Sequence, residues 1–210
     1  MDSYARRERA SLADLLVEVG PDAPTLCEGW RARQLAAHLI IREHRLDAIP
    51  GILFHPFAGH TDRVLARYAD RPFAELVATM RSGPPAWSPT RITAVDAAAN
   101  TVEFFVHHED VRRAQPDWSP RSDDLALEHA LAARLSQMAK LSFRHSPVGV
   151  RLEPVGHSPI EAKSGEGTVA IVGPPGEIVM FMNGRRGHAR VELRGPADAV
   201  QRLEQVSLGI

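Results

Sequence analysis

The sequence has little cysteine and no excess of charge of either sign. Cys27 is its only cysteine in 210 residues, so no internal disulfide can form. A chain without disulfides is typical of a reducing compartment. Lys and Arg number 25 against 26 Asp and Glu, which gives a formal net charge of −1. This balance argues against a general nucleic-acid binder, which usually carries a basic excess on one face.

Long uncharged apolar runs are also missing. No run approaches the roughly 20 apolar residues that a membrane-spanning helix needs. Residues 1–7 meet a charge every few positions and so lack the apolar core of a signal peptide. We therefore expect a soluble, cytoplasmic protein without a membrane or nucleic-acid partner. The apolar content, 44% of residues, is enough to bury a sizeable core.

Helical periodicity dominates the first two-thirds of the chain. Apolar residues recur at the spacing of one helix face, and Gly and Pro interrupt the pattern at intervals. The predicted long helices cover residues 3–19, 31–49, 93–114 and 122–144, with one or two shorter helices in 59–82. Several long helices joined by short loops predict a helical bundle, and cofactor sites of bundles usually lie between facing helices.

The pattern changes period near residue 146. Apolar residues then alternate, as in half-buried strands separated by Gly/Pro turns. The alternating positions are Val148, Val150 and Leu152; Val169 and Ile171; Ile178 and Met180; and Val191 and Leu193. Residues 196–206 are amphipathic and predict a closing helix. We therefore predict an α+β chain with a four-helix bundle in 1–145 and a small α/β domain with an antiparallel or mixed sheet in 146–210.

Glu103 and His107 form the first candidate for chemistry. They lie four residues apart in a segment without a helix breaker, so both point to the same side, one turn apart. The apolar neighbours Val102, Phe105 and Val106 indicate that this side faces inward. A carboxylate that faces a core is costly unless something satisfies it, and a metal ion would. The spacing alone is weak, because short motifs of this kind also arise by chance.

His38 is the second candidate. It lies in the middle of a predicted helix beside Ala36 and Ala37, where the surroundings predict an apolar residue. Small neighbours would let another helix approach closely. The residue is either a metal ligand or a buried histidine bonded to a backbone carbonyl, and the local sequence alone favours the second interpretation.

Two stretches carry a recognisable pattern. Residues 26–39 read LCEGWRARQLAAHL, and residues 103–114 contain Glu-x-x-x-His followed by Asp-x-x-x-Ala. Both resemble the DinB-like metal-binding superfamily, in particular an uncharacterised metal-binding subgroup of its mycothiol-dependent maleylpyruvate isomerase branch. Residues 176–185 resemble the small α/β domain of that branch more loosely. The resemblance implies a DinB-like bundle with His38, Glu103 and His107 as ligands of a divalent metal.

This ligand set has a chemistry of its own. Two neutral imidazoles and one carboxylate leave a divalent ion with positive charge and vacant positions, as in catalytic rather than structural zinc sites. Zinc is the first choice, and nickel, iron or manganese also suit these donors. The resemblance implies mycothiol as a thiol cosubstrate, used to isomerise a small electrophile or transferred to it. A non-catalytic ligand-binding module and a metal-dependent hydrolase are the alternatives.

Three further residues allow more than one interpretation. Arg185 is either a catalytic clamp for a substrate carboxylate or an exposed arginine at a strand end. Cys27 is either a nucleophile or a packed loop thiol. Asp110 either orients a ligand as a hydrogen-bond acceptor or pairs with Arg113 on the helix surface. The expected partners are a small thiol and an electrophilic substrate. The chain could also form a homodimer through an apolar stripe of the bundle.

Overall fold

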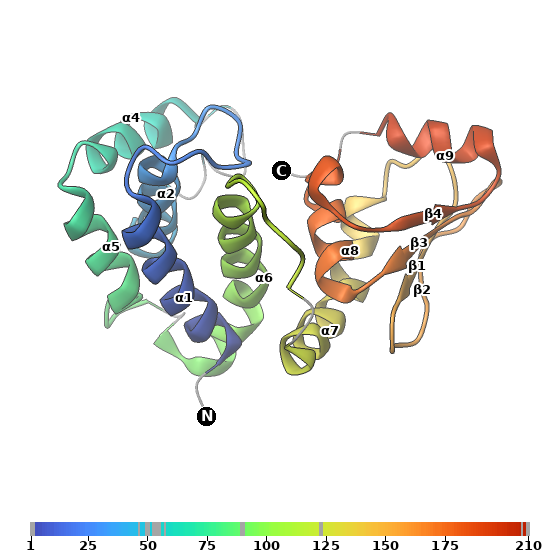
Figure 1. Cartoon of the computed structure of the whole chain (residues 1–210), viewed down its shortest axis with the longest axis horizontal. Helices are drawn as coiled ribbons and strands as arrows, with labels where there is room; N and C mark the ends of the chain where they lie inside the picture. Colours follow the sequence, from blue (N-terminus) through green and yellow to red (C-terminus); the bar gives the residue numbers. More distant parts are fainter. Residues whose placement is uncertain are drawn as a thin grey trace. The chain divides into compact units, whose positions relative to one another are not determined.

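The chain divides into two compact units, Met1–Trp118 and Ser119–Ile210, in the computed structural model (Figure 1). The structure describes residues 3–45, 47–48, 51, 56, 58–88, 91–121, 124–206 and 208, and of residues 93, 94 and 98 it describes the backbone. The second helix was predicted to run to residue 49, but the helix that begins at Ala32 ends at His44, with Arg45 as its C-cap; residues 46, 49 and 50 lie outside the described residues.

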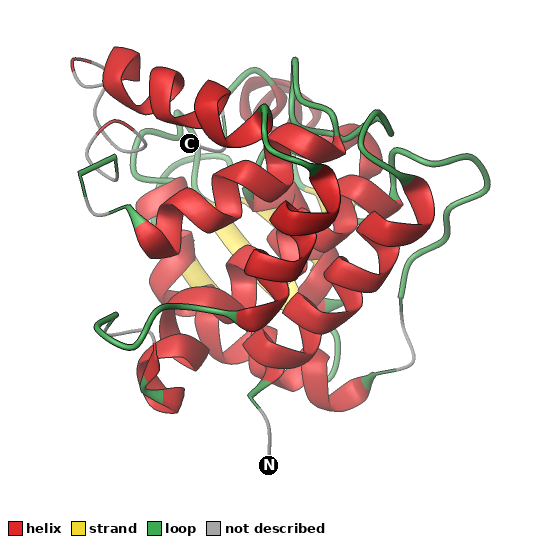
Figure 2. Ribbon diagram, turned by 90° about the vertical axis from the view of Figure 1, so that its left-hand side faces the viewer, coloured by secondary structure: helices red, strands yellow, loops and turns green. Residues whose placement is uncertain are grey.

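Helices joined by loops make up the described part of the first unit (Figure 2). They are α1 (Tyr4–Val19), α2 (Ala32–His44), α4 (Ala58–Ala69), α5 (Phe73–Ser82) and α6 (Thr93–Arg112). α1 packs against α5 and α6, and α2 packs against α4 and α5. α1, α2, α5 and α6 share one core, in which Leu12, Leu35 and Phe104 are fully buried, and Val64 of α4 packs with Ile41 and Ala48 in a second cluster. The helical character predicted for these segments is confirmed, and residues 59–82 form two helices.

A buried polar cluster joins α1, α2 and α6 inside this core. The Arg9 guanidinium donates to both carboxylate oxygens of Glu43, at 2.5 and 2.6 Å, and lies 4.3 Å from the ring centre of Phe104. The Asn100 amide donates to Glu43 at 3.1 Å and to Asp96 at 2.8 Å. Because these buried groups hydrogen-bond to one another across three helices, the cluster fixes α2 and α6 relative to α1.

A four-stranded sheet and several helices form the second unit. Its elements are α7 (Leu125–Ser142), β1 (Val150–Pro154), β2 (Ile160–Lys163), β3 (Val169–Gly173), α8 (Pro175–Met182), the 3-10 helix η3 (Arg186–His188), β4 (Glu192–Arg194) and α9 (Ala197–Glu204). The strand order is β2-β1-β3-β4, with β1 and β3 parallel and the outer pairs antiparallel. The α+β class and the mixed sheet are therefore confirmed. α7 packs against α8 and β2, and α9 packs against β3.

One predicted strand is wrong. Ile178 and Met180 lie in α8, a helix of eight residues that are all buried. A short, wholly apolar run fits a buried strand and a buried helix equally well, since it has no polar face to reveal the period. Pro174 and Pro175 precede the run, and proline in the first turn of a helix carries no penalty because its missing N–H would have no helical partner there. Strand β2 was not predicted.

The division into units differs from the predicted boundary at residue 145. The helix predicted for 122–144 forms as α7 and lies in the second unit, where the buried side chains Leu127, Leu131 and Leu135 line its inner face. Its contacts with α8 and β2 explain this placement. The four-helix arrangement over 1–145 stays a prediction.

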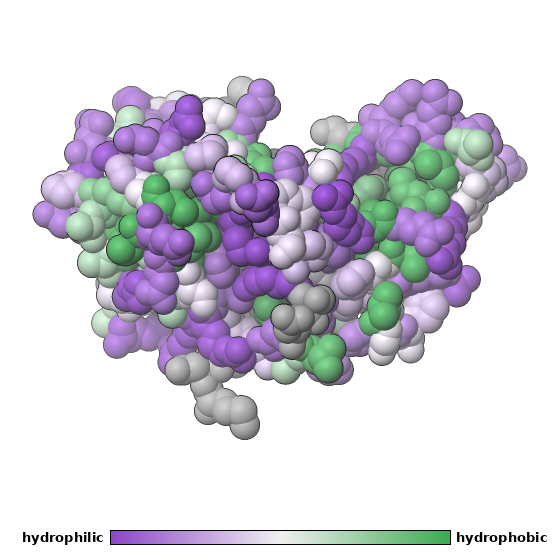
Figure 3. All heavy atoms as spheres, in the orientation of Figure 1, coloured by the Kyte–Doolittle hydropathy of each residue, from purple (hydrophilic) through white to green (hydrophobic). Residues whose placement is uncertain are grey.

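The surface has no dominant apolar region on the face drawn in Figure 3, where hydrophilic and hydrophobic residues are interspersed on both units. Large exposed apolar residues occur singly, as at Val17, Trp87 and Leu125. Scattered residues of this kind are normal on protein surfaces. Among the described residues, no helix combines the length and apolarity that a bilayer crossing requires.

Candidate metal centre

His38, Glu103 and His107 meet between α2 and α6. Glu103 and His107 lie one turn apart on α6, and His38 reaches them from the middle of α2. The Nε2 atoms of His107 and His38 lie 3.3 and 3.5 Å from Glu103 Oε1. The centres of the two imidazole rings are 5.3 Å apart. One ligand atom from each residue lies within 4.8 Å of the others, so the three side chains share a common point.

The carboxylate is the charged centre of this group. Burial would raise the pKa of Glu103, but hydrogen bonds from His107 and His38 and the charges of His107 and Arg42 hold it well below its usual range. Arg42 Nε lies 3.2 Å from Glu103 Oε1. About a quarter of the Glu103 side chain is exposed, at 26%.

The two imidazoles differ in their charge state. Burial lowers the pKa of His38, against a hydrogen bond to Glu103 that raises it. Burial would also lower the pKa of His107, but its hydrogen bonds with Asp110, Cys27 and Glu103 raise it well above its usual range. The two pKa shifts are therefore opposite in direction, toward the neutral form for His38 and toward the protonated form for His107.

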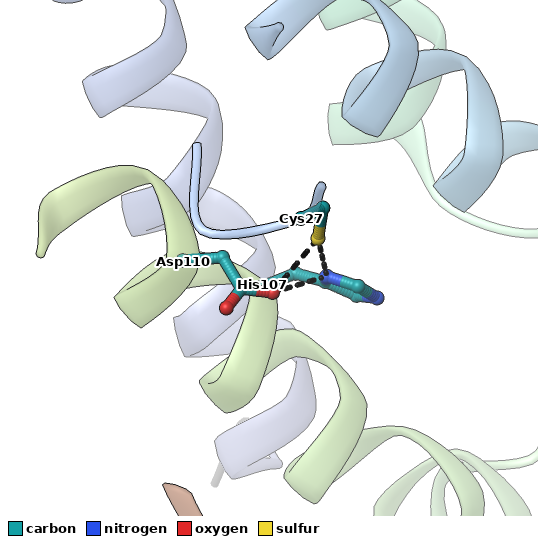
Figure 4. A group of neighbouring side chains, drawn as sticks. All are labelled: Cys27, His107 and Asp110. Atoms are coloured by element: carbon teal, nitrogen blue, oxygen red, sulfur yellow. Dashed lines mark hydrogen bonds and ion pairs between the residues drawn. The ribbon is translucent and has the colours of Figure 1, made fainter. Parts of the chain in front are cut away.

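The Nδ1 edge of the His107 ring, on the side away from Glu103, contacts Asp110 and Cys27 (Figure 4). His107 Nδ1 donates to Asp110 Oδ2 at 3.0 Å, and the same oxygen accepts from Cys27 Sγ at 3.1 Å. Cys27 Sγ lies 3.9 Å from His107 Nδ1. Asp110 is fully buried, and its backbone carbonyl accepts from the amide of Leu26 at 3.0 Å. The carboxylate therefore fixes the proton on Nδ1 and directs Nε2 toward Glu103 and His38.

Asp110 was interpreted either as an acceptor that orients a ligand or as a partner of Arg113, and its contacts favour the first. The contact with His107 is the one expected of an orienting acceptor, and Arg113 pairs with Glu109 at 2.5 Å. Cys27 is a half-buried thiol, and with His107 and Asp110 it forms a second group of neighbouring potential ligands. That group shares His107 with the first and uses the opposite nitrogen of its ring.

The loop before α2, which carries Cys27, lines a pocket of about 370 Å³. Its lining residues are Pro24, Thr25, Cys27, Glu28, Gly29, Trp30 and Arg31. The Trp30 ring centre lies 5.0 Å from that of His38, and Cys27 contacts His107. Two residues that line the pocket therefore each contact a candidate ligand. Neither Trp30 nor Arg42 was predicted from the sequence to lie at this site. The spacing of Arg42, four residues after His38 on one helix face, was the available signal; Trp30 lies in a loop without periodicity.

Arg185 lies in the second unit, directly after α8. Its backbone amide donates to the Met180 carbonyl at 3.0 Å and its guanidinium to the Asn183 carbonyl at 2.5 Å. Arg185 is half-buried and lies next to the 3-10 helix η3 rather than at a strand end. Its role as a carboxylate clamp stays a prediction. His108, which follows His107 on α6, is buried, and its Nδ1 lies 3.0 Å from Glu8 Oε2.

Comparison with known proteins gives matches to solved structures. No family model and no curated protein matches the sequence. Among solved structures, the mycothiol-dependent maleylpyruvate isomerase matches with a TM-score of 0.58 and 18% identity, over 90% of both chains. A histidine-to-alanine mutant of that isomerase matches with a TM-score of 0.54 and 16% identity, again over 90% of both chains.

The fold and the side-chain cluster together define an α+β protein whose helical unit presents two imidazoles and a carboxylate at one point. The mycothiol-dependent maleylpyruvate isomerase is a solved structure that shares this fold over 90% of the chain. The resemblance predicted from residues 26–39 and 103–114 is thereby confirmed at the level of the fold.

Proposed function

We propose that this protein is a divalent-metal-dependent enzyme that uses a low-molecular-weight thiol on a small electrophile. The single observation that carries the proposal is the convergence of His38, Glu103 and His107, supplied by two helices of a fold shared with a thiol-dependent isomerase. The reaction is either isomerisation or transfer of the thiol, and mycothiol is the thiol that the structural neighbour uses.

The donor atoms fit a metal. Two donors held at about 2.0–2.2 Å by one tetrahedral ion lie about 3.3–3.6 Å apart. The two nitrogen-to-oxygen separations are 3.3 and 3.5 Å, within that range. Three protein ligands would leave positions open, as in catalytic sites. Zinc suits the donors best, and nickel, iron or manganese remain alternatives. A bound ion of this kind would act as a Lewis acid and hold a coordinated thiol as the reactive thiolate.

The chain's own residues would prepare the site. Asp110 holds His107 with Nε2 toward the common point, and the buried cluster of Arg9, Glu43 and Asn100 holds the two helices that carry the ligands. Trp30 and Cys27 would bound the approach of the substrate from the loop side. Arg185 would bind a carboxylate of the electrophile, because a guanidinium pairs with a carboxylate through two parallel hydrogen bonds.

Metal analysis of the purified protein tests the site. We expect about one divalent ion per chain in the wild type and in His60→Ala, an exposed histidine of the same unit that serves as a matched control. His38→Ala should lose most of the ion, because a ligand is removed while the fold is kept. A metal-free wild type, or equal metal in His38→Ala, would contradict the proposal.

An activity assay then separates the functions. The metal-loaded protein should consume a conjugated electrophile such as a maleyl derivative only when the thiol is present, and Glu103→Gln should abolish this consumption. Hydrolysis of simple esters without the thiol would instead indicate a metal-dependent hydrolase. Binding of the thiol without turnover of any electrophile would indicate a non-catalytic module.

A further inference from the structure

A second pair of histidines lies in the unit that the metal proposal does not use. His129 is in the second turn of α7, and His157 is in the turn between β1 and β2. His129 Nδ1 and His157 Nε2 are 3.3 Å apart, and the ring centres are 5.4 Å apart. Two elements distant in the sequence therefore bring two imidazole nitrogens into contact.

The turn that carries His157 is held by backbone hydrogen bonds. The amide of Val155 donates to the Gly173 carbonyl at 2.9 Å, and the amide of His157 donates to the Pro154 carbonyl at 3.0 Å. Gly156 has a φ of 76°, a left-handed conformation that glycine adopts without strain. The position of His157 is thus set by the sheet, without a contribution from its ring.

A hydrogen bond also selects the tautomer of the neutral His157 ring. Its Nδ1 lies 3.0 Å from the carbonyl oxygen of Val155. A carbonyl can only accept, so Nδ1 carries the proton and Nε2 presents its lone pair toward His129. Metal-binding histidines characteristically donate their second nitrogen to a carbonyl or carboxylate in this way. Without a metal, His129 Nδ1 donates to this lone pair.

We propose that His129 and His157 form a second site, which binds a divalent transition-metal ion such as Zn²⁺ or Ni²⁺. Two nitrogens bound to one tetrahedral zinc at about 2.0–2.1 Å lie about 3.3–3.4 Å apart, and the pair is already at 3.3 Å. Binding requires the His129 proton to move from Nδ1 to Nε2 through solvent, since His129 is exposed. The exchange leaves both imidazoles neutral.

The ion would tie α7 to the β1–β2 turn. Among the described residues, no third ligand joins the pair in a group of three, so water would complete the coordination. The carboxylate of Glu128, next to His129, accepts from the Gly176 amide at 2.9 Å and adds negative charge nearby. Two protein ligands with water predict reversible binding that stabilises the second unit when the ion is present.

The test uses the full chain with His38→Ala and His107→Ala in every protein, because together these substitutions remove ligands from both candidate groups of the first unit. Ni²⁺ or Zn²⁺ alone is titrated by calorimetry, with the fold checked by circular dichroism. We expect one ion per chain in this background and in the added control His145→Ala, an exposed histidine of the same unit.

Addition of His129→Ala or His157→Ala should weaken that binding about tenfold or more and remove the rise in Tm caused by the ion. The two variants lie on different elements, so a folding defect in one leaves the other as the test. Absence of binding in the background, or binding that neither substitution changes, would overturn the proposal. Equal weakening by His145→Ala would show only adventitious surface binding and would overturn it as well.

Discussion

At the scale of single residues, Asp110 is the group that decides how His107 is presented. It is fully buried and accepts hydrogen bonds from both His107 Nδ1 and the Cys27 thiol. Outer partners of metal-bound histidines raise ligand basicity and fix ring orientation, and their removal typically costs about 10–100-fold in metal affinity. The carboxylate of Asp110 is placed for this function.

We therefore predict that Asp110→Ala weakens zinc binding by about 10–100-fold without removing any direct ligand. Competition with a chromophoric chelator measures this affinity. Cys27→Ala is the matched control, since it removes the other donor to the same oxygen and leaves the His107 contact in place, and its effect should be much smaller. Unchanged affinity in Asp110→Ala would show that the packing of α6 alone orients the ring.

Part of this site could be predicted from the sequence. Glu103 and His107 are four residues apart on one helix, so their common direction follows from helix geometry. The contact between Cys27 and Asp110 joins residues 83 positions apart, and no periodicity encodes it. The same holds for His129 and His157, since a turn of the sheet and a separate helix meet only in the folded unit.

At the scale of elements, the buried cluster of Arg9, Glu43 and Asn100 joins three helices of the first unit. Arg9 and Glu43 are each about 4% exposed. When one partner of a buried ion pair is removed, the other is left as an uncompensated charge, which costs about 3–5 kcal/mol. The pair is therefore far more sensitive to single substitutions than the exposed ion pairs of the surface, which contribute about 0–1 kcal/mol.

Glu43→Ala is predicted to lower the free energy of unfolding by about 3–5 kcal/mol, measured by urea denaturation of the metal-free protein. Glu18→Ala, at an exposed glutamate of α1, should change it by less than about 0.5 kcal/mol. The double variant Arg9→Met with Glu43→Leu should recover much of the loss, because it buries no charge. A small effect of Glu43→Ala would mean that water reaches the cluster.

Gly149 shows a tighter constraint in the second unit. A Cβ atom at this position would lie 2.7 Å from the Gly165 carbonyl oxygen and 2.4 Å from the Thr168 hydroxyl. The carbonyl belongs to the backbone and cannot move without displacing the chain that leads into β3. Gly187 offers a comparison, because a Cβ there would meet nothing within 4 Å.

Gly149→Ala should accordingly destabilise the protein by about 1–3 kcal/mol, the usual range for overpacking. Gly187→Ala should stay within about 0.5 kcal/mol of the wild type. Thermal unfolding followed by circular dichroism distinguishes the two. Equal stabilities for both variants would show that the approach of residues 149 and 165 can relax at little cost.

The helix α8 marks the limit of prediction at this scale. Ile178 and Met180 were predicted to lie in a strand and lie in a helix instead, because the apolar run of residues 178–182 has no polar position that would reveal its period. By contrast, β1 and β3 alternate buried and less buried positions, and both were predicted. Patterns with two distinct faces reveal their period, and uniform ones do not.

At the scale of the whole molecule, the placement of α7 decides where the second unit begins. The periodicity of the sequence predicts a boundary at residue 145, because the helical pattern gives way to an alternating one there. The contacts put it at residue 118, because α7 packs against α8 and β2. A change of periodicity locates a change of secondary structure, and it does not reveal which helix covers which sheet.

We expect a fragment of residues 119–210 to fold on its own and a fragment of residues 146–210 to fail. The longer fragment keeps the buried face of α7, formed by Leu127, Leu131, Leu135 and Ala139, over α8, whose eight residues are all buried. In the shorter one this apolar surface would face water, at a cost of about 25 cal/mol for each Å² exposed.

Circular dichroism and thermal unfolding of the two purified fragments give the answer. Cooperative unfolding is expected for 119–210, and a gradual change without a transition, or aggregation, is expected for 146–210. The same result bears on the second metal site, since only the longer fragment contains both His129 and His157. If the shorter fragment unfolds cooperatively, then α7 is an accessory of the sheet, and the boundary predicted from periodicity is the better description of how the chain folds.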